Sequence, residues 1–160
     1  MMLNRQQRRA LAHRRPEKRE RINPASALNP IVLCQQFTPD EASILSNETR
    51  LAWYRLTHGD GTQPDFDLVA NCSNIALVQS EEIGREAVEV VLDAQVSIIA
   101  MKERYMRTGA FGADAEALAT VPAMLDLYDQ LLSFGSPAKM IQALDETVRR
   151  VRMQLRGGVC

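Results

Sequence analysis

Hydrophobic side chains recur at steps of three and four over most of this chain, which is the spacing of one face of an α-helix. The clearest stretch lies between Glu81 and Arg107, where the recurring residues are Ile83, Ala87, Val90, Ala94, Ile98, Met101 and Tyr105. Further apolar residues widen that face and leave a polar strip only through Glu82, Glu86, Glu89, Asp93 and Ser97. This pattern predicts a central helix that neighbours cover on most sides.

Two helix starts can be identified from their capping residues. Thr38-Pro39-Asp40-Glu41 is a capping box with proline in the first turn, and it predicts a helix that runs to about His58 and ends at Gly59. This helix presents Leu45, Ala52, Trp53 and Leu56 to a core. Thr62 to Asp65 then opens a second helix, which extends to about Ser80 and carries the apolar residues Phe66, Val69, Ala70, Ser73, Ile75, Ala76 and Leu77.

Glycine and proline divide the rest of the chain into two further helices. Gly109 and Gly112 frame a turn, after which apolar residues recur at Leu118, Val121, Leu125, Tyr128 and Leu132. We expect this helix to kink or restart at Pro122, because proline has no amide donor. Gly135 ends it, and Ser136-Pro137 caps a last helix with the apolar residues Ile141, Leu144, Val148, Val151 and Leu155. On this helix the spacing predicts ion pairs of Asp145 with Arg149 and of Glu146 with Arg150.

These elements predict an all-α fold: a single bundle-like domain of about five helices over residues 31–160. Aromatic residues make up only 5% of the chain, so the core must consist mainly of Leu, Ile, Val, Met and Ala. Paired strand patterns with tight turns are absent. Residues 1–30 precede the domain and consist of a basic arm and a linker with Pro16, Pro24 and Pro30. Asn4 can cap a short helix to about Arg15, but we expect a flexible arm, because so short a helix is marginal in water.

The charge of the chain is divided between the arm and the body. Of 19 basic and 20 acidic residues, eight basic and two acidic ones lie in the first 22 positions, which leaves 11 basic and 18 acidic residues for the rest. The basic residues of the arm are Arg5, Arg8, Arg9, Arg14, Arg15, Lys18, Arg19 and Arg21. The near-zero net charge therefore hides an arm of +6 and a body of −7. Such an arm attracts a polyanion or an acidic protein surface.

Nucleic acid is the partner that this arm favours, and the contact would be with phosphates. Each phosphate that a cation neutralises releases counterions, which gives affinity without sequence specificity. The arm has no interleaved aromatic residues to stack on bases. An alternative is that the arm docks on the acidic body, because residues 40–93 contain eleven acidic and three basic side chains.

A second functional hypothesis is a protein-binding adaptor or inhibitor, including an inhibitor of a host defence nuclease. It would use an acidic helical surface made of Glu81, Glu82, Glu86, Glu89 and Asp93. Homodimerisation is a further hypothesis, because several helices have apolar stripes broader than one neighbour requires. Buried core helices explain the same stripes, so the sequence leaves both explanations open.

The sequence favours no enzyme, cofactor or metal site. The histidines are His13 in the arm and His58, which we expect to complement the dipole at a helix end. Cys72 lies in an apolar helical register and is expected to be a core residue. Asp60, Asp65 and Asp67 surround a glycine turn but lack the spacing of a calcium loop, so we expect helix capping instead. Three widely spaced cysteines and the absence of a long apolar run favour a cytoplasmic protein without membrane contact.

Residues 104–158 carry an Arg-Thr-Gly turn, a leucine-rich helix with L-x-L-x-x-Q-L near its end, a short polar break and a final helix with an Arg-rich end. In this the chain resembles an uncharacterised family of short helical proteins carried by proteobacterial prophages, plasmids and integrative elements. The opening LNRQQRRA is similar to the starts of phage-encoded proteins. The resemblance implies an accessory protein of a mobile element, and it implies no activity and no catalytic residues.

Overall fold

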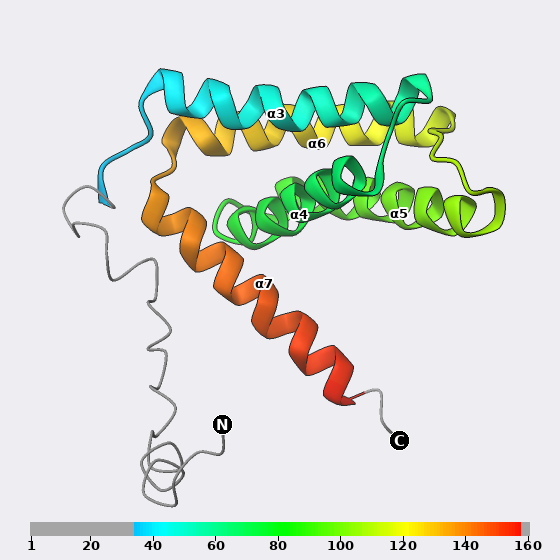
Figure 1. The fold of residues 1–160 in the computed structure, drawn as a ribbon. Coiled ribbons are helices and arrows are strands. Elements are labelled where there is room, and N and C mark those ends of the chain that lie inside the picture. The colour runs from blue at the N-terminus through cyan, green and yellow to red at the C-terminus, as the bar shows by residue number, and fades with distance from the viewer. Residues whose placement is uncertain (1–33, 158–160) are drawn as a thin grey trace, which may run out of the picture.

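The structure is a computed structural model that describes the backbone of residues 34–157 and the side chains as far as Met153. This part of the chain forms five helices and no strand (Figure 1): α3 (Pro39–His58), α4 (Gln63–Ser80), α5 (Arg85–Thr108), α6 (Ala115–Phe134) and α7 (Pro137–Gly157). The predicted all-α class is therefore confirmed. The basic arm and its predicted short helix lie outside the described residues.

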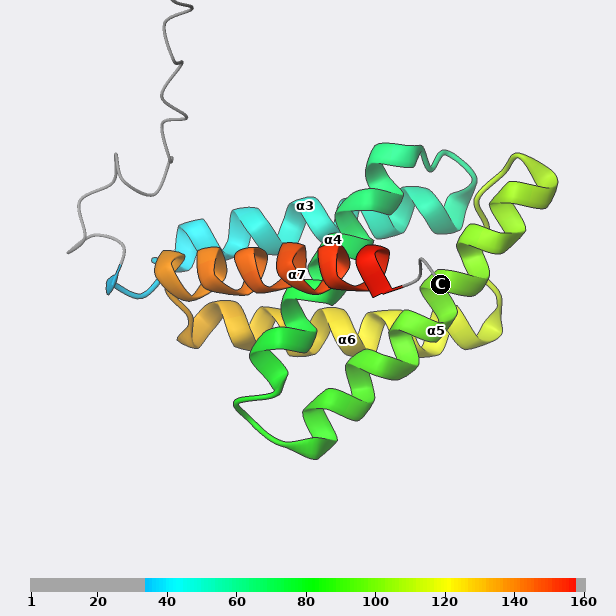
Figure 2. The ribbon, with the colours of Figure 1, turned by 90° about the horizontal axis from the view of Figure 1, so that it is seen from below.

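The helices pack around α4 and α6. α3 and α6 lie side by side and run in opposite directions, and α4 crosses them on one side (Figure 1). α5 packs against α4 and α6 at the edge of the body, and α7 lies across α4 on the side away from α3 and α6 (Figure 2). α5 and α7 thus each have one face against the bundle and one face turned away from it.

The predicted capping box at the start of α3 is present, and the start of α4 has one as well. The Thr38 hydroxyl accepts from the Glu41 amide at 3.3 Å, while the Glu41 carboxylate accepts from the Thr38 amide at 2.9 Å. Thr62 and Asp65 make the same reciprocal bonds at the start of α4. α3 ends as predicted at Gly59, whose φ of 89° is a conformation that glycine adopts without strain.

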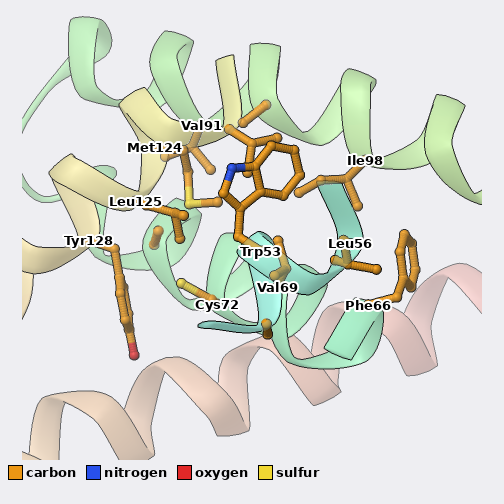
Figure 3. Packing of buried hydrophobic residues seen from close by; sticks show 14 of the residues in the cluster. Trp53, Leu56, Phe66, Val69, Cys72, Val91, Ile98, Met124, Leu125 and Tyr128 are labelled. Carbon is orange, nitrogen blue, oxygen red and sulfur yellow. The ribbon is translucent and has the colours of Figure 1, made fainter. Parts of the chain in front are cut away.

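The core lies where α3, α4, α5 and α6 meet. Side chains of Val91 and Ile98 on α5 and of Met124 on α6 surround the indole of Trp53 from α3 (Figure 3). The predicted core residues Ala52, Trp53 and Leu56 are buried, and so are Val69, Ile75 and Ala76 of α4. Leu118 was predicted in the core, but it lies on the outward side of α6 and is 52% exposed.

α5 differs from its prediction in where it begins and in how it is rotated. It starts at Arg85, since residues 81–83 form a turn that Gly84 closes with a φ of 148°. Ile83 therefore lies outside the helix and is 61% exposed. Ser97, which the sequence placed on the polar side, is buried, whereas Val96 and Ile99 are exposed. The expectation of neighbours on most sides of this helix is wrong.

Pro122 does not interrupt α6, which continues as one helix from Ala115 to Phe134. The expected restart at this proline is wrong. Proline removes the donor for the carbonyl of the residue four positions earlier, which here is Leu118. Because Leu118 lies on the exposed side of the helix, water can bond to that carbonyl and the helix can continue.

α7 packs on the body through a different row of residues than the predicted one. Ala143 is buried, whereas Leu144, Val148 and Val151 of the predicted apolar face are 41–46% exposed. The predicted Glu146–Arg150 ion pair is present at 2.8 Å. Arg149 pairs with Glu146 at 2.6 Å instead of with Asp145.

Candidate binding surfaces

The predicted phosphate-contacting side chains of the arm, Arg5, Arg8, Arg9, Arg14, Arg15, Lys18, Arg19 and Arg21, lie outside the described residues. The structure does show where the chain joins the body. The Phe37 amide donates to the Gly135 carbonyl at 3.1 Å, which fixes the segment before α3 at the α6–α7 junction. The described part of the chain therefore begins at the end of the bundle where α6 passes into α7.

The five predicted protein-binding acids do not form one free surface. Glu81 accepts two hydrogen bonds from Arg150, each of 2.7 Å, and Glu82 lies 3.3 Å from Lys139. All three contacts join the α4–α5 turn to α7. Glu89 pairs with Arg85 one turn earlier on α5, at 2.7 Å. Three of the five acids thus have a cation of the body beside them.

Hydrogen bonds to arginine favour the charged form of the acids around α7. Bonds from Arg149 and then Arg150 lower the pKa of Glu146 to about 2. The bond from Arg150 likewise holds the pKa of Glu81 below its usual value. These groups are partly or largely open to solvent, so each pair adds little stability on its own. The Arg150–Glu81 and Lys139–Glu82 pairs join α7 to the α4–α5 turn.

Glu86 and Asp93 are the two predicted acids without an ion pair among the described residues, and both are exposed. The same helix carries a row of exposed apolar side chains, made of Leu92, Val96, Ile99 and Met106, which we name the outer stripe of α5. The exposed Glu103 lies in this row between Ile99 and Met106. Leu92, Val96 and Ile99 were predicted to widen the covered apolar face of this helix. The signal that could have revealed the stripe is Ser97, a polar residue between apolar ones that is suited to face a neighbouring helix.

A groove of about 570 Å³ lies between the end of α4, the end of α6 and the start of α7. Its walls carry Val78, Leu127 and Leu131, and its rim carries Ile83 and Phe134, which are 61% and 77% exposed. Sequence reasoning did not find this groove, because residues more than 50 positions apart form it. Glu82 and Glu146 line it together with Gly135, where the segment before α3 is bonded.

His58 and Cys72 take the positions that the sequence predicted. The His58 ring lies at the end of α3, where Nδ1 is 2.8 Å from the Tyr54 carbonyl and the ring stacks on Tyr54 at 3.8 Å. Cys72 is in the core, and burial raises the pKa of its thiol. Cys34 is exposed. A buried thiol with a raised pKa is unreactive, so the geometry assigns Cys72 to packing.

The aspartates around the α3–α4 turn act as local hydrogen-bond partners. Asp65 caps α4 and lies 3.3 Å from Arg55, and Asp67 accepts from Gln63 at 2.6 Å. Within residues 34–153, no three His, Cys, Asp or Glu side chains come together as a metal site would require. No described helix is both long and apolar enough to cross a membrane.

Comparison of this chain with protein-family models, with curated proteins and with solved structures finds no match. The resemblance of residues 104–158 to proteins of mobile elements thus stays a prediction.

Proposed function

We propose that this chain is a non-enzymatic binding protein whose basic arm contacts the phosphates of nucleic acid, as an accessory protein of a mobile element. The observation that carries the proposal is the charge division, with eight basic and two acidic residues in the first 22 positions. A charge of this density binds a polyanion by releasing counterions. The absence of aromatic residues from these 22 positions favours backbone contacts over base stacking.

The ion pairs of the body support a partner in another molecule over docking of the arm on its own body. Glu82 and Glu146 share a groove with Gly135, where the segment before α3 is attached. Both acids already bond to cations of α7, namely Lys139, Arg149 and Arg150. An arm that docked there would have to displace these cations, so the gain in Coulomb energy would be small.

Other acids of the body serve separate helices. Glu41 caps the start of α3, Asp65 caps the start of α4, and Glu89 pairs within α5. These acids are engaged within the body, which favours the nucleic-acid proposal over an adaptor that uses its acidic residues to imitate nucleic acid.

The test is the salt dependence of binding to a labelled duplex, measured by fluorescence anisotropy. With six to eight phosphates contacted, the slope of log affinity against log salt is expected to be about −5 to −7. Deletion of residues 1–22 should abolish binding. The matched variant E17Q/E20Q, which removes the only acids of the arm, should bind more tightly and with the same steep dependence.

Affinity that does not respond to salt, or that survives the deletion, would overturn the proposal. The adaptor hypothesis makes the opposite prediction. It expects a stoichiometric protein partner that is recovered at moderate salt after nuclease treatment and that is lost when Glu86 and Asp93 are neutralised.

A further inference from the structure

The groove between the end of α4, the end of α6 and the start of α7 is an apolar surface that no described segment fills. Val78, Leu127 and Leu131 form its walls, and its volume of about 570 Å³ has room for several side chains. Phe134 at its rim is 77% exposed, which is the largest exposed fraction among the large apolar residues of the described chain. An apolar groove with exposed apolar residues at its rim is typical of a binding site.

The described part of the chain begins beside this groove. The Phe37 amide donates to the Gly135 carbonyl at 3.1 Å, and Gly135 lines the groove. Figure 1 shows the start of α3, the end of α6 and the start of α7 at the same end of the body. Leu131 and Leu127 precede Gly135 by one and two turns of α6, or about 6 and 12 Å along the helix. Ten residues of extended chain span up to about 33 Å, so residues 27–36 are long enough to follow the whole groove from Phe37.

The composition of the residues before Phe37 fits an apolar groove. Residues 22–39 contain no charged side chain, and the run Ala27-Leu28-Asn29-Pro30-Ile31-Val32-Leu33 carries four large aliphatic side chains. At the rim of the groove Glu82 already lies 3.3 Å from Lys139. An uncharged segment leaves this ion pair in place, whereas the basic residues of the arm would have to compete with Lys139 for it.

We propose that residues 27–33 of this chain occupy the groove of the same molecule. Packing of the four aliphatic side chains on the apolar walls removes apolar surface of both partners from water. The hydrogen bond of Phe37 fixes the chain only four residues after Leu33, so the loop that docking closes is short and its entropic cost is small. A separate peptide or a second copy has no such link to the groove and would have to bind from solution.

The inference is independent of the proposed function, but it specifies where the arm begins. Arg21 lies six positions before Ala27, so docking keeps this last cation of the arm within about 20 Å of the groove. A polyanion bound by the arm would then lie at the end of the body that carries the α4–α5 turn. Docking needs no nucleic acid and is tested without it, so its failure would leave the salt test of the proposed function unaffected.

Photo-crosslinking from the rim of the groove tests the proposal in the full chain. Phe134→p-benzoylphenylalanine places a photoreactive ring at an exposed position, and mass spectrometry of peptides maps its adducts. We expect adducts within residues 27–33, at a yield that does not change with chain concentration. Leu118→p-benzoylphenylalanine is the matched control, because Leu118 is 52% exposed and lies about 24 Å away along the same helix. This control should give no adduct within residues 27–33.

Added charges test whether the contact is apolar. In the chain with the photoreactive ring at position 134, I31D/V32D should lower the adduct yield at least about tenfold, because two carboxylates would have to leave water. The matched control A25D/S26D adds the same two charges to the uncharged stretch outside the docked residues, and it should leave the yield unchanged. Circular dichroism checks that both variants keep the helix content of the natural chain.

Three results from the photoreactive chains would overturn the proposal. Adducts from position 134 that lie outside residues 27–33 would show that another segment or no segment fills the groove. An equal yield from position 118 would show that the contact is unspecific. A yield that rises with concentration would show that a second copy supplies the segment. A yield that is unaffected by I31D/V32D would also overturn it.

Discussion

The hydroxyls of Ser97 and Thr120 join α5 to α6, and a double-mutant cycle can test this contact. Thr120 Oγ1 donates to the Glu116 carbonyl at 2.9 Å, so Ser97 must be the donor in the 2.9 Å bond between the two hydroxyls. Ser97→Ala removes this donor and leaves Thr120 bonded to its own helix. The expected loss is one ordinary hydrogen bond, about 0.5–1.5 kcal/mol.

Thr120→Val acts differently, because it leaves a buried donor without its partner. Ser97 is 3% exposed, so its hydroxyl cannot turn to water, and the expected loss is about 1–3 kcal/mol. A bond from Ser97 back to a carbonyl of its own helix would bring the loss to the lower end of that range. The double variant removes both partners and should lose about 1 kcal/mol less than the sum of the two single variants.

Urea unfolding followed by circular dichroism at 222 nm measures these losses. All four proteins must be compared at one concentration, because association would add to the apparent stability. Additive losses would show that the two hydroxyls are not coupled. The described hydrogen bond between Ser97 and Thr120 would then be wrong.

Three further predictions concern the body. A Cβ atom at Gly61 would come within 2.7 Å of the Leu56 backbone, so Gly61→Ala should lower the free energy of unfolding by about 1–3 kcal/mol. A free energy of unfolding in urea equal to that of the natural chain would contradict this close approach. A thiol reagent added to the folded chain should modify Cys34 and spare Cys72 until the protein unfolds, as peptide mapping can show. The pKa of Glu146 is lowered from its usual value of 4.5 to about 2, so its ion pairs stabilise the fold above pH 4.5 and are lost as the pH falls toward about 2. Carbon NMR of the carboxyl group should show a titration midpoint near 2, and a midpoint near 4.5 would refute the pairing.

The helix boundaries that could be predicted are those that neighbouring residues determine. Thr38 and Glu41 cap α3 through bonds three residues apart, so four consecutive letters are enough to place the helix start. The start of α5 was misplaced because Ile83 fits the helical spacing even though it precedes the helix. Gly84 was the available signal, since its φ of 148° ends the turn.

The rotation of α5 could not be predicted, because its apolar residues cover so much of the circumference that spacing alone does not select the buried side. The buried side carries the small residues Ala94 and Ser97, and Ser97 bonds to Thr120 of α6, a contact that spacing within α5 does not reveal. Ion pairs across the fold were unpredictable for a similar reason. Glu81 and Arg150 are 69 positions apart, and only the packing of α7 on the α4–α5 turn brings them together.

Salt should separate binding by the arm from any contact that apolar side chains of the body make. Binding of the arm to phosphates is driven by counterion release, so it should fall by several orders of magnitude between about 0.05 and 0.5 M salt. A contact through exposed apolar side chains such as Val96 and Ile99 would lose only a small part of its affinity, because salt screens charges. Nucleic-acid affinity measured by fluorescence anisotropy at both salt concentrations tests this difference. Affinity that persists at the higher concentration would refute phosphate contact by the arm.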